Sequence, residues 1–243
     1  MRLAIYQSYF FPYIGYFQLM QAVDKFILYD YLHYIDGGWI ARNRIMSPDG
    51  HTFYMYIPIE KKSSNRRINE LVISHHEDWQ QKVAGQLRSC YGKAPFFQQL
   101  FPWVEDLLMQ PCDRLSAFNY KSLTAIARLL DIPTEIVWDH TLYQAIEERL
   151  ETENYPLEKK SQRPLWICRQ EKADTFVNAI GGQKLYSKAI FAEQGVELFF
   201  LQSDKYMRQE PDNVPMPELS ILDVLFRYGV EETKRLLHCY TLI

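Results

Sequence analysis

The first thirty residues carry two short apolar runs, each followed closely by a polar side chain. The run at residues 3–5 leads to Gln7, and the run at residues 26–29 leads to Asp30. Between them Pro12 ends any strand, because proline cannot donate to a strand ladder, and apolar residues then recur at roughly helical spacing. The order is therefore strand, loop, helix and strand. It predicts that the two strands are parallel neighbours. Ligands of such open sheets bind at the carboxyl ends of the strands, so Gln7 and Asp30 mark the first place to look for a site.

The middle of the chain predicts a hairpin followed by helices. Pro48-Asp49-Gly50 is a turn signal between strand-like runs at 42–46 and 52–59. In the second run Tyr54 and Tyr56 alternate with apolar residues, which predicts one buried face and one aromatic face. Apolar residues at helical spacing then predict a helical portion over about 77–131.

The last hundred residues return to alternating elements. A strand is expected near residues 135–139. Residues 144–163 are the least hydrophobic stretch, which predicts a surface helix and loop and a mobile segment. Helix, Gly181-Gly182, helix and a strand at 196–200 follow, and Gly229 separates two closing helices. The predicted fold is therefore a single α/β domain over residues 1–243. It has a mostly parallel sheet, the strand-loop-helix-strand opening, a β-hairpin excursion and a helical middle portion.

Composition excludes several classes of function. A net charge of −3 and a pI near 6.1 give no electrostatic basis for nucleic-acid binding. The sequence has no glycine-rich phosphate loop, no secretory signal at its start and no apolar stretch of roughly 20 residues, the length that spans a membrane. Its four scattered cysteines suit a reducing compartment. We expect a cytoplasmic protein.

Arg42-Asn43-Arg44 is the first candidate binding group. On a strand both guanidinium groups project from one face, an arrangement suited to a carboxylate or phosphate. The alternative is a pair of surface ion pairs. Asp30 is the candidate catalytic carboxylate, and the equally weighted alternative is that it caps the next segment.

Aromatic and basic side chains form a second group of candidates. Tyr13 and Tyr16, in the aromatic loop after the first strand, are candidates for stacking on a sugar or base, and core packing is the alternative. Lys61-Lys62 and Arg66-Arg67 read as a solvated loop, with a phosphate-contacting patch as the alternative. No histidine pair has metal-ligand spacing, so no metal site is expected. Asp139-His140 is a further acid/base candidate.

With these segments in view, the chain resembles the WbqC-like family. That family opens with a loop of the form Q-P-x-Y-F-P-W-x-G-Y-F, and residues 7–17 here read Q-S-Y-F-F-P-Y-I-G-Y-F. Asp24, Phe26 and Asp30 match a following A-D-x-F-V-x-L-D stretch. The segments at 42–45, 91–97 and 219–229 are also family-like.

Some positions depart from the family pattern. His33 and Asp36 stand where the family tends to have glutamine and lysine, and Arg227 stands where asparagine is usual. The segment 203–208 keeps only Tyr206 of an H-P-x-Y-x-Q-like stretch. Asp36 inverts a charge near the expected site, which predicts weaker binding of an anionic ligand there.

The resemblance implies a transferase acting on bacterial surface-polysaccharide (O-antigen) building blocks, with transfer of glycine or a similar group to a sugar. It implies a small-molecule substrate, a sugar or nucleotide sugar, and names no cofactor or oligomeric state. Two alternatives stay open: a divergent non-catalytic binding protein, and a nucleotide-binding enzyme similar to the nucleotidylyltransferases. The expected substrate-binding residues are Gln7, Tyr13, Tyr16, His33, Arg42, Asn43, Arg44 and Tyr206.

Overall fold

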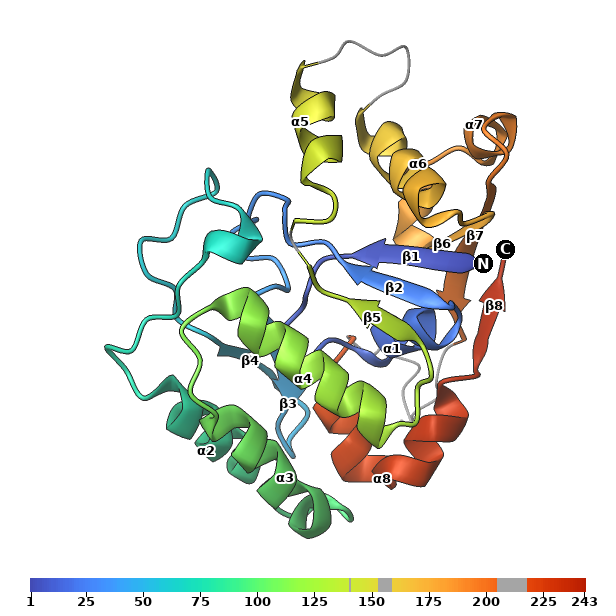
Figure 1. Cartoon of the computed structure of the whole chain (residues 1–243). Helices are drawn as coiled ribbons and strands as arrows, with labels where there is room; N and C mark the ends of the chain where they lie inside the picture. The colour runs from blue at the N-terminus through green and yellow to red at the C-terminus, as the bar shows by residue number, and fades with distance from the viewer. Residues whose placement is uncertain (140, 153–158, 205–217) are drawn as a thin grey trace.

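A computed structural model describes residues 1–139, 141–152, 159–204 and 218–243 (Figure 1). Its centre is a six-stranded sheet in the order β5-β2-β1-β6-β7-β8. All neighbouring strands are parallel except the last pair, β7 and β8. The strand bounds are β1 Arg2–Tyr6, β2 Lys25–Leu28, β5 Glu135–Val137, β6 Thr175–Ala179, β7 Glu197–Ser203 and β8 Tyr240–Leu242.

Helices cover both faces of this sheet. Successive side chains of a strand point to opposite faces, and Leu3 and Ala4 of β1 accordingly belong to two different hydrophobic clusters. Ala4 packs in the cluster with α1, α2, α3, α4 and α8, and Leu3 in the cluster with α5, α6 and α7. The helices are α1 Ile14–Gln21, α2 Trp79–Tyr91, α3 Phe97–Met109, α4 Leu115–Leu129, α5 Gln144–Thr152, α6 Lys159–Glu171, α7 Lys188–Glu193 and α8 Ile221–Leu236, with short 3-10 helices at Ile68–Glu70 and Ile180–Lys184.

The predicted opening and hairpin are confirmed. β1 and β2 are parallel neighbours in register from Leu3↔Lys25 to Tyr6↔Leu28, with α1 between them in sequence. The hairpin consists of β3 (Arg42–Met46) and β4 (Thr52–Tyr56), and forms a separate two-stranded sheet. The carboxyl ends of β1 and β2 point toward the side of the molecule that carries this hairpin (Figure 1).

The helical middle portion is confirmed as α2, α3 and α4, and Gly229 interrupts α8 with a φ of 74°. One central strand was not expected from the sequence. The segment before Gly181-Gly182 contains α6 and then β6, which pairs with β1 and completes the sheet.

The chain order of the strands reverses between β1 and β6. From β1 the chain steps outward to β2 and β5, and it then returns to the other side of β1 to form β6 and β7. In open α/β sheets ligands bind at such a reversal, outside the carboxyl ends of the strands. The register of β1 with β6 covers only Arg2↔Thr175 and Leu3↔Phe176, near the amino ends of both strands. The two strands therefore diverge toward the carboxyl edge.

In the part of the chain described, no helix combines the length and the apolar character that crossing a membrane requires.

Candidate functional site

The loop after β1, residues 7–13, is held in place by buried side chains from distant segments. Asn43 donates through Nδ2 to the carbonyls of Phe10 (3.0 Å) and Phe11 (2.7 Å). Asn119 donates to the carbonyl of Ser8 (2.9 Å), and the Ser220 hydroxyl donates to the carbonyl of Phe11 (2.8 Å). Carbonyls of an irregular segment that cannot reach water need such partners. These contacts hold Phe11 at a positive φ of 40°, which is costly for a side chain with a Cβ.

Asp30 is one more of these supports. Its carboxylate accepts hydrogen bonds from the Ser8 backbone N–H (2.9 Å) and the Ser8 hydroxyl (2.6 Å), and the residue is fully buried. Burial raises the pKa of Asp30 to about 6, although the hydrogen bonds from Ser8 oppose the shift. The strands β1 and β2 are adjacent as expected from the sequence, and Asp30 meets Ser8, the residue after Gln7. In this conformation the Asp30 carboxylate is sealed from solvent, and both of its oxygens are used to hold the loop.

This burial predicts a specific pH dependence of stability. The pKa of Asp30 is about 6 in the folded protein against 3.8 as its ordinary value, so between pH 4 and 6 the folded state holds a proton that the unfolded state has lost. The contribution of Asp30 to stability therefore falls as pH rises through this window, by about 3 kcal/mol, and then levels off. Asp30→Asn, which removes the titration, is expected to lose this fall, as measured by urea unfolding at several pH values. Asp106→Asn, an exposed change on α3, should keep the parental profile. A parental profile in Asp30→Asn would contradict the assignment.

The expected tyrosines lie at the carboxyl end of β1. The Tyr16 hydroxyl donates to the carbonyl of Gln7 (2.8 Å), and its ring packs against Tyr6 and Tyr9 at centroid distances of 5.3 and 5.6 Å. Tyr16 is buried, whereas Tyr13 and Gln7 are half-buried. Burial raises the pKa of Tyr13, and the neighbouring Tyr6 adds to the shift. This hydroxyl is thus a neutral hydrogen-bond partner at physiological pH.

Arg42 and Arg44 project from one face of β3 onto aromatic rings. The Arg42 guanidinium carbon lies 4.4 Å from the centroid of Tyr54, and that of Arg44 lies 4.9 Å from Trp39. The two rings stack on each other with centroids 6.5 Å apart. We call this surface, with Tyr56, the arginine–aromatic face. Asn43 lies between the two arginines in sequence and points to the opposite, buried face, as strand alternation requires.

Both arginines retain hydrogen-bonding capacity. Arg42 donates to the Gly37 carbonyl, and Arg44 donates through Nη2 to the Glu218 carbonyl (3.2 Å). Within the described ranges, Nε of each is buried and has no hydrogen-bond partner. A guanidinium carries five N–H donors, more than these contacts use.

A groove of about 400 Å³ lies against this face. Its volume falls in the range of about 300–1,000 Å³ that small-molecule sites occupy. Tyr54 and Tyr56 are 43% and 39% exposed, unusually open for rings in a folded protein. Lys82 donates to the Tyr56 hydroxyl (2.9 Å) and fixes that ring. The groove is lined by Tyr34, Asp36, Gly37, Ala41, Arg42, Tyr54, Tyr56, Ile57, Pro58, Ile59 and Lys62.

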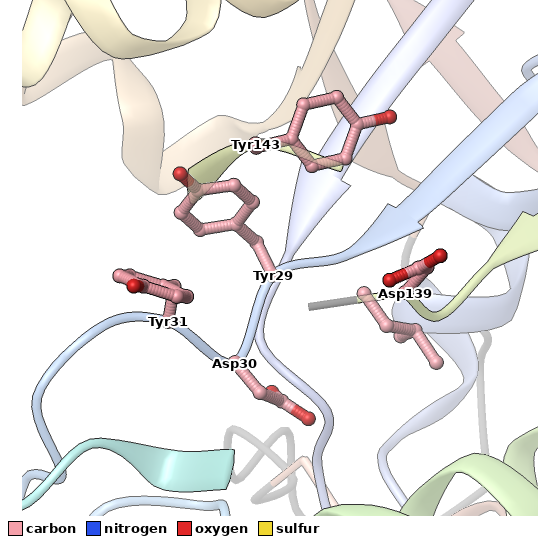
Figure 2. A pocket seen from close by; sticks show the side chains of 6 residues that line it. Tyr29, Asp30, Tyr31, Asp139 and Tyr143 are labelled. Carbon is pink, nitrogen blue, oxygen red and sulfur yellow. The ribbon is translucent and has the colours of Figure 1, made fainter. Parts of the chain in front are cut away.

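A second depression lies at the carboxyl ends of β2 and β5 (Figure 2). Its volume of about 10 Å³ is room for about one water molecule. Tyr29 and Tyr143 pack there with ring centroids 5.9 Å apart, and Figure 2 shows Asp30 pointing away from this pair. In this conformation the depression is too small for a substrate, so the groove is the better candidate site.

The structure thus brings only some of the expected residues together. Arg42 lines the groove and Arg44 lies beside it, whereas Asp30, Asn43 and Tyr16 are used in bracing the first loop. His33 is exposed and forms a backbone bridge with Arg67. Tyr206 and His140 lie outside the described residues.

Sequence reasoning missed two side chains at this site, Trp39 and Tyr34, and named Lys62 only within the alternative reading of a basic loop. The aromatic face predicted for the second hairpin strand was a real signal, because Tyr54 and Tyr56 both line the groove. Among the described residues, no group of three or more His, Cys, Asp or Glu side chains is placed to hold a metal ion.

Fold and site together define a doubly wound α/β protein with a groove of about 400 Å³ beside its β3-β4 hairpin. The chain belongs to the WbqC-like protein family, whose model matches residues 7–235. The family resemblance seen in the sequence is confirmed. The chain is also similar to the uncharacterized protein Rv1507c of Mycobacterium tuberculosis (strain ATCC 25618 / H37Rv), with 28% identity over 243 residues and 98% of each chain covered. No solved structure matches the chain.

Proposed function

We propose that this protein is a transferase that acts on a phosphorylated sugar building block of bacterial surface polysaccharide. In this proposal the groove at the arginine–aromatic face binds the donor or acceptor, a nucleotide sugar or sugar phosphate. The transferred group that the family resemblance implies is glycine or a similar group. The observation that carries the proposal is the placement of Arg42 and Arg44 on one strand face, each over an aromatic ring, with Arg42 lining and Arg44 beside a groove of about 400 Å³.

The arginines suit a phosphate. Guanidinium groups form paired hydrogen bonds to phosphate oxygens, and the attraction of these two to the rings of Tyr54 and Trp39 helps to hold them in place. Residues two apart on a strand are separated by about 6.5–7 Å along it. Two guanidinium groups at that spacing can contact neighbouring phosphates of one ligand.

The aromatic rings suit a sugar. Tyr54 and Tyr56 are 43% and 39% exposed, with Arg42 lying over the Tyr54 ring and Lys82 over the Tyr56 ring, so a ligand would contact the parts of the rings that these cations leave open. Such amphipathic rings contact the apolar face of a ligand while the polar tip donates or accepts hydrogen bonds. Asp30, the predicted catalytic carboxylate, enters this proposal as the group that orients the first loop, because it is buried and both of its oxygens are bonded to Ser8.

The test is ligand binding by arginine variants. A thermal-shift screen over nucleotides, nucleotide sugars, sugar phosphates and amino acids identifies the ligand class, since a bound ligand stabilises the folded state. For the nucleotide sugar or sugar phosphate that stabilises the parent, Arg42→Ala/Arg44→Ala is expected to bind at least tenfold more weakly, because each lost charge-assisted contact is worth about 1.5–3 kcal/mol. Titration calorimetry measures the change.

Two further variants make the test specific. Arg42→Lys/Arg44→Lys keeps the charge and loses the paired donors, so it should lie between the parent and the alanine variant. Arg235→Ala removes an exposed arginine on α8 and should bind like the parent. A double alanine variant that unfolds at the parental temperature and binds nucleotide sugars with parental affinity would eliminate the proposed role.

Strand order favours a second candidate, a nucleotide-binding enzyme of the nucleotidylyltransferase type. The order β5-β2-β1-β6-β7, with divergence of β1 from β6, is typical of sheets that bind nucleotides at this edge. Tyr13 and Tyr16 lie at the start of α1, directly beyond β1. Stabilisation by nucleoside triphosphates that depends on Tyr13, and not on Arg42 or Arg44, would favour this candidate. The third reading, a binding protein without activity, predicts no stabilisation across the screen.

A further inference from the structure

One wall of the groove is built from two loops that lie side by side. The backbone N–H of Tyr34 donates to the carbonyl of Arg66 (2.9 Å), and that of Ile68 donates to the carbonyl of Leu32 (3.0 Å). His33 and Arg67 form an antiparallel bridge between these contacts. The wall therefore has a defined geometry although it contains no regular strand.

This wall brings a cation and an anion to the groove. Lys62 and Asp36 form an ion pair, and both line the groove together with Arg42. The hydrogen bond from Lys62 lowers the pKa of Asp36, and Arg42 contributes to the same shift. Asp36 therefore acts on both cations of the groove.

The charged residues of the groove indicate how the Lys62–Asp36 ion pair affects anion binding. Among the described residues that line the groove, the charged ones are Arg42, Lys62 and Asp36, so one carboxylate offsets one of two cations. The Lys62 and Asp36 side chains are 48% and 61% exposed. An ion pair this exposed contributes little to stability, because water screens both charges. A multiply charged ligand can therefore displace Asp36 from Lys62.

We propose that Lys62 is an additional anion-binding residue of the groove and that Asp36 competes with the ligand for it. This inference rests on the proposed function for the phosphate of the ligand. The pair makes Asp36 a specificity-determining residue, since it selects against the most highly charged anions and favours a phosphate whose charge is partly masked by esterification.

The experiment uses inorganic pyrophosphate, a small and highly charged ligand. Titration calorimetry at low ionic strength, where surface charges are least screened, compares the parent with Asp36→Asn, Lys62→Gln and the double variant. Asp36→Asn is expected to bind about three- to fivefold more tightly, the equilibrium equivalent of the upper range for an exposed ion pair. In the Lys62→Gln background the Asp36→Asn change should bring less than half of that gain.

Lys61→Gln is the matched control. Lys61 is the adjacent exposed lysine and does not line the groove, so in the Asp36→Asn background its replacement should leave the gain intact. The inference is overturned if Asp36→Asn gives no gain, or if the gain is the same without Lys62, because the carboxylate would then act through Arg42 alone. All of these side chains are exposed, and parental unfolding temperatures confirm that the variants fold.

The two proposals fail separately. If nucleotide sugars bind in a manner that depends on Arg42 and Arg44, and Asp36→Asn does not change pyrophosphate affinity, the competition is wrong and the proposed function stands. If the arginine variants bind nucleotide sugars like the parent, and Asp36→Asn still acts through Lys62, the proposed function is wrong and the competition between Asp36 and the anion stands.

Discussion

Replacement of Asn43 by alanine is expected to lower the free energy of unfolding by about 3 kcal/mol, because it breaks a set of buried hydrogen bonds. The carboxamide donates to the carbonyls of Phe10 and Phe11 and accepts from the Arg44 N–H at 2.7 Å. The residue is 3% exposed, so water cannot replace all of these contacts. Phe11 at a positive φ adds to the loss, since a strained residue persists only where its surroundings hold it.

Urea unfolding measures this effect, with Asn65→Ala as control. Asn65 is exposed in the loop before the first 3-10 helix, so its replacement should change stability by no more than about 0.5 kcal/mol. Because Asn43 lies between Arg42 and Arg44, its loss should also weaken ligand binding at the arginine–aromatic face. A loss of stability below about 1 kcal/mol would contradict the view that buried side chains hold the first loop in place.

Replacement of Arg163 by methionine is the second change with a large expected effect, a loss of about 3 kcal/mol. Arg163 of α6 donates through Nε and Nη2 to both oxygens of Glu147 on α5, at 2.5 and 2.9 Å, and the Tyr29 hydroxyl donates to the same carboxylate at 2.6 Å. The Glu147 side chain is only 8% exposed. Removal of the cation leaves this carboxylate buried with one partner, and the penalty for an uncompensated buried charge dominates.

Arg169→Met is the matched control on the same helix. Arg169 is exposed and bonded to Gln194, so the change should cost no more than about 0.5 kcal/mol. Adding Glu147→Gln to Arg163→Met should restore a large part of the lost stability, because it removes the stranded charge. Failure of that second change to recover any stability would show that the loss comes from packing of the arginine stem instead.

The local parts of the fold were predictable from the sequence. The β1-α1-β2 opening and the β3-β4 hairpin follow from patterns a few residues long, apolar runs with a proline and a Pro-Asp-Gly turn. β6 was missed because its apolar core, Phe176-Val177, is only two residues long and lies between two helices. Its place in the sheet depends on pairing with β1 and β7, segments distant in sequence.

In the candidate site, too, the local features were predictable and the contacts between distant segments were not. Strand alternation placed Arg42 and Arg44 on one face correctly. That Asp30 meets Ser8, and that Trp39 meets Arg44, depends on how loops fold back on one another, which no local pattern encodes. Mobility of residues 144–163 stays a prediction, although α5 and the start of α6 within that segment are joined by Glu147 and Arg163.

The short register between β1 and β6 has a mechanical consequence. The sheet consists of two halves, β5-β2-β1 and β6-β7-β8, and the hydrogen-bonded pairing between them is confined to the amino ends of β1 and β6. In the first half α1 connects β1 to β2, and in the second half α7 lies between β6 and β7. A ligand bound between the carboxyl ends of β1 and β6 would contact both halves of the sheet. Its binding would therefore restrict how the two halves can rotate relative to each other.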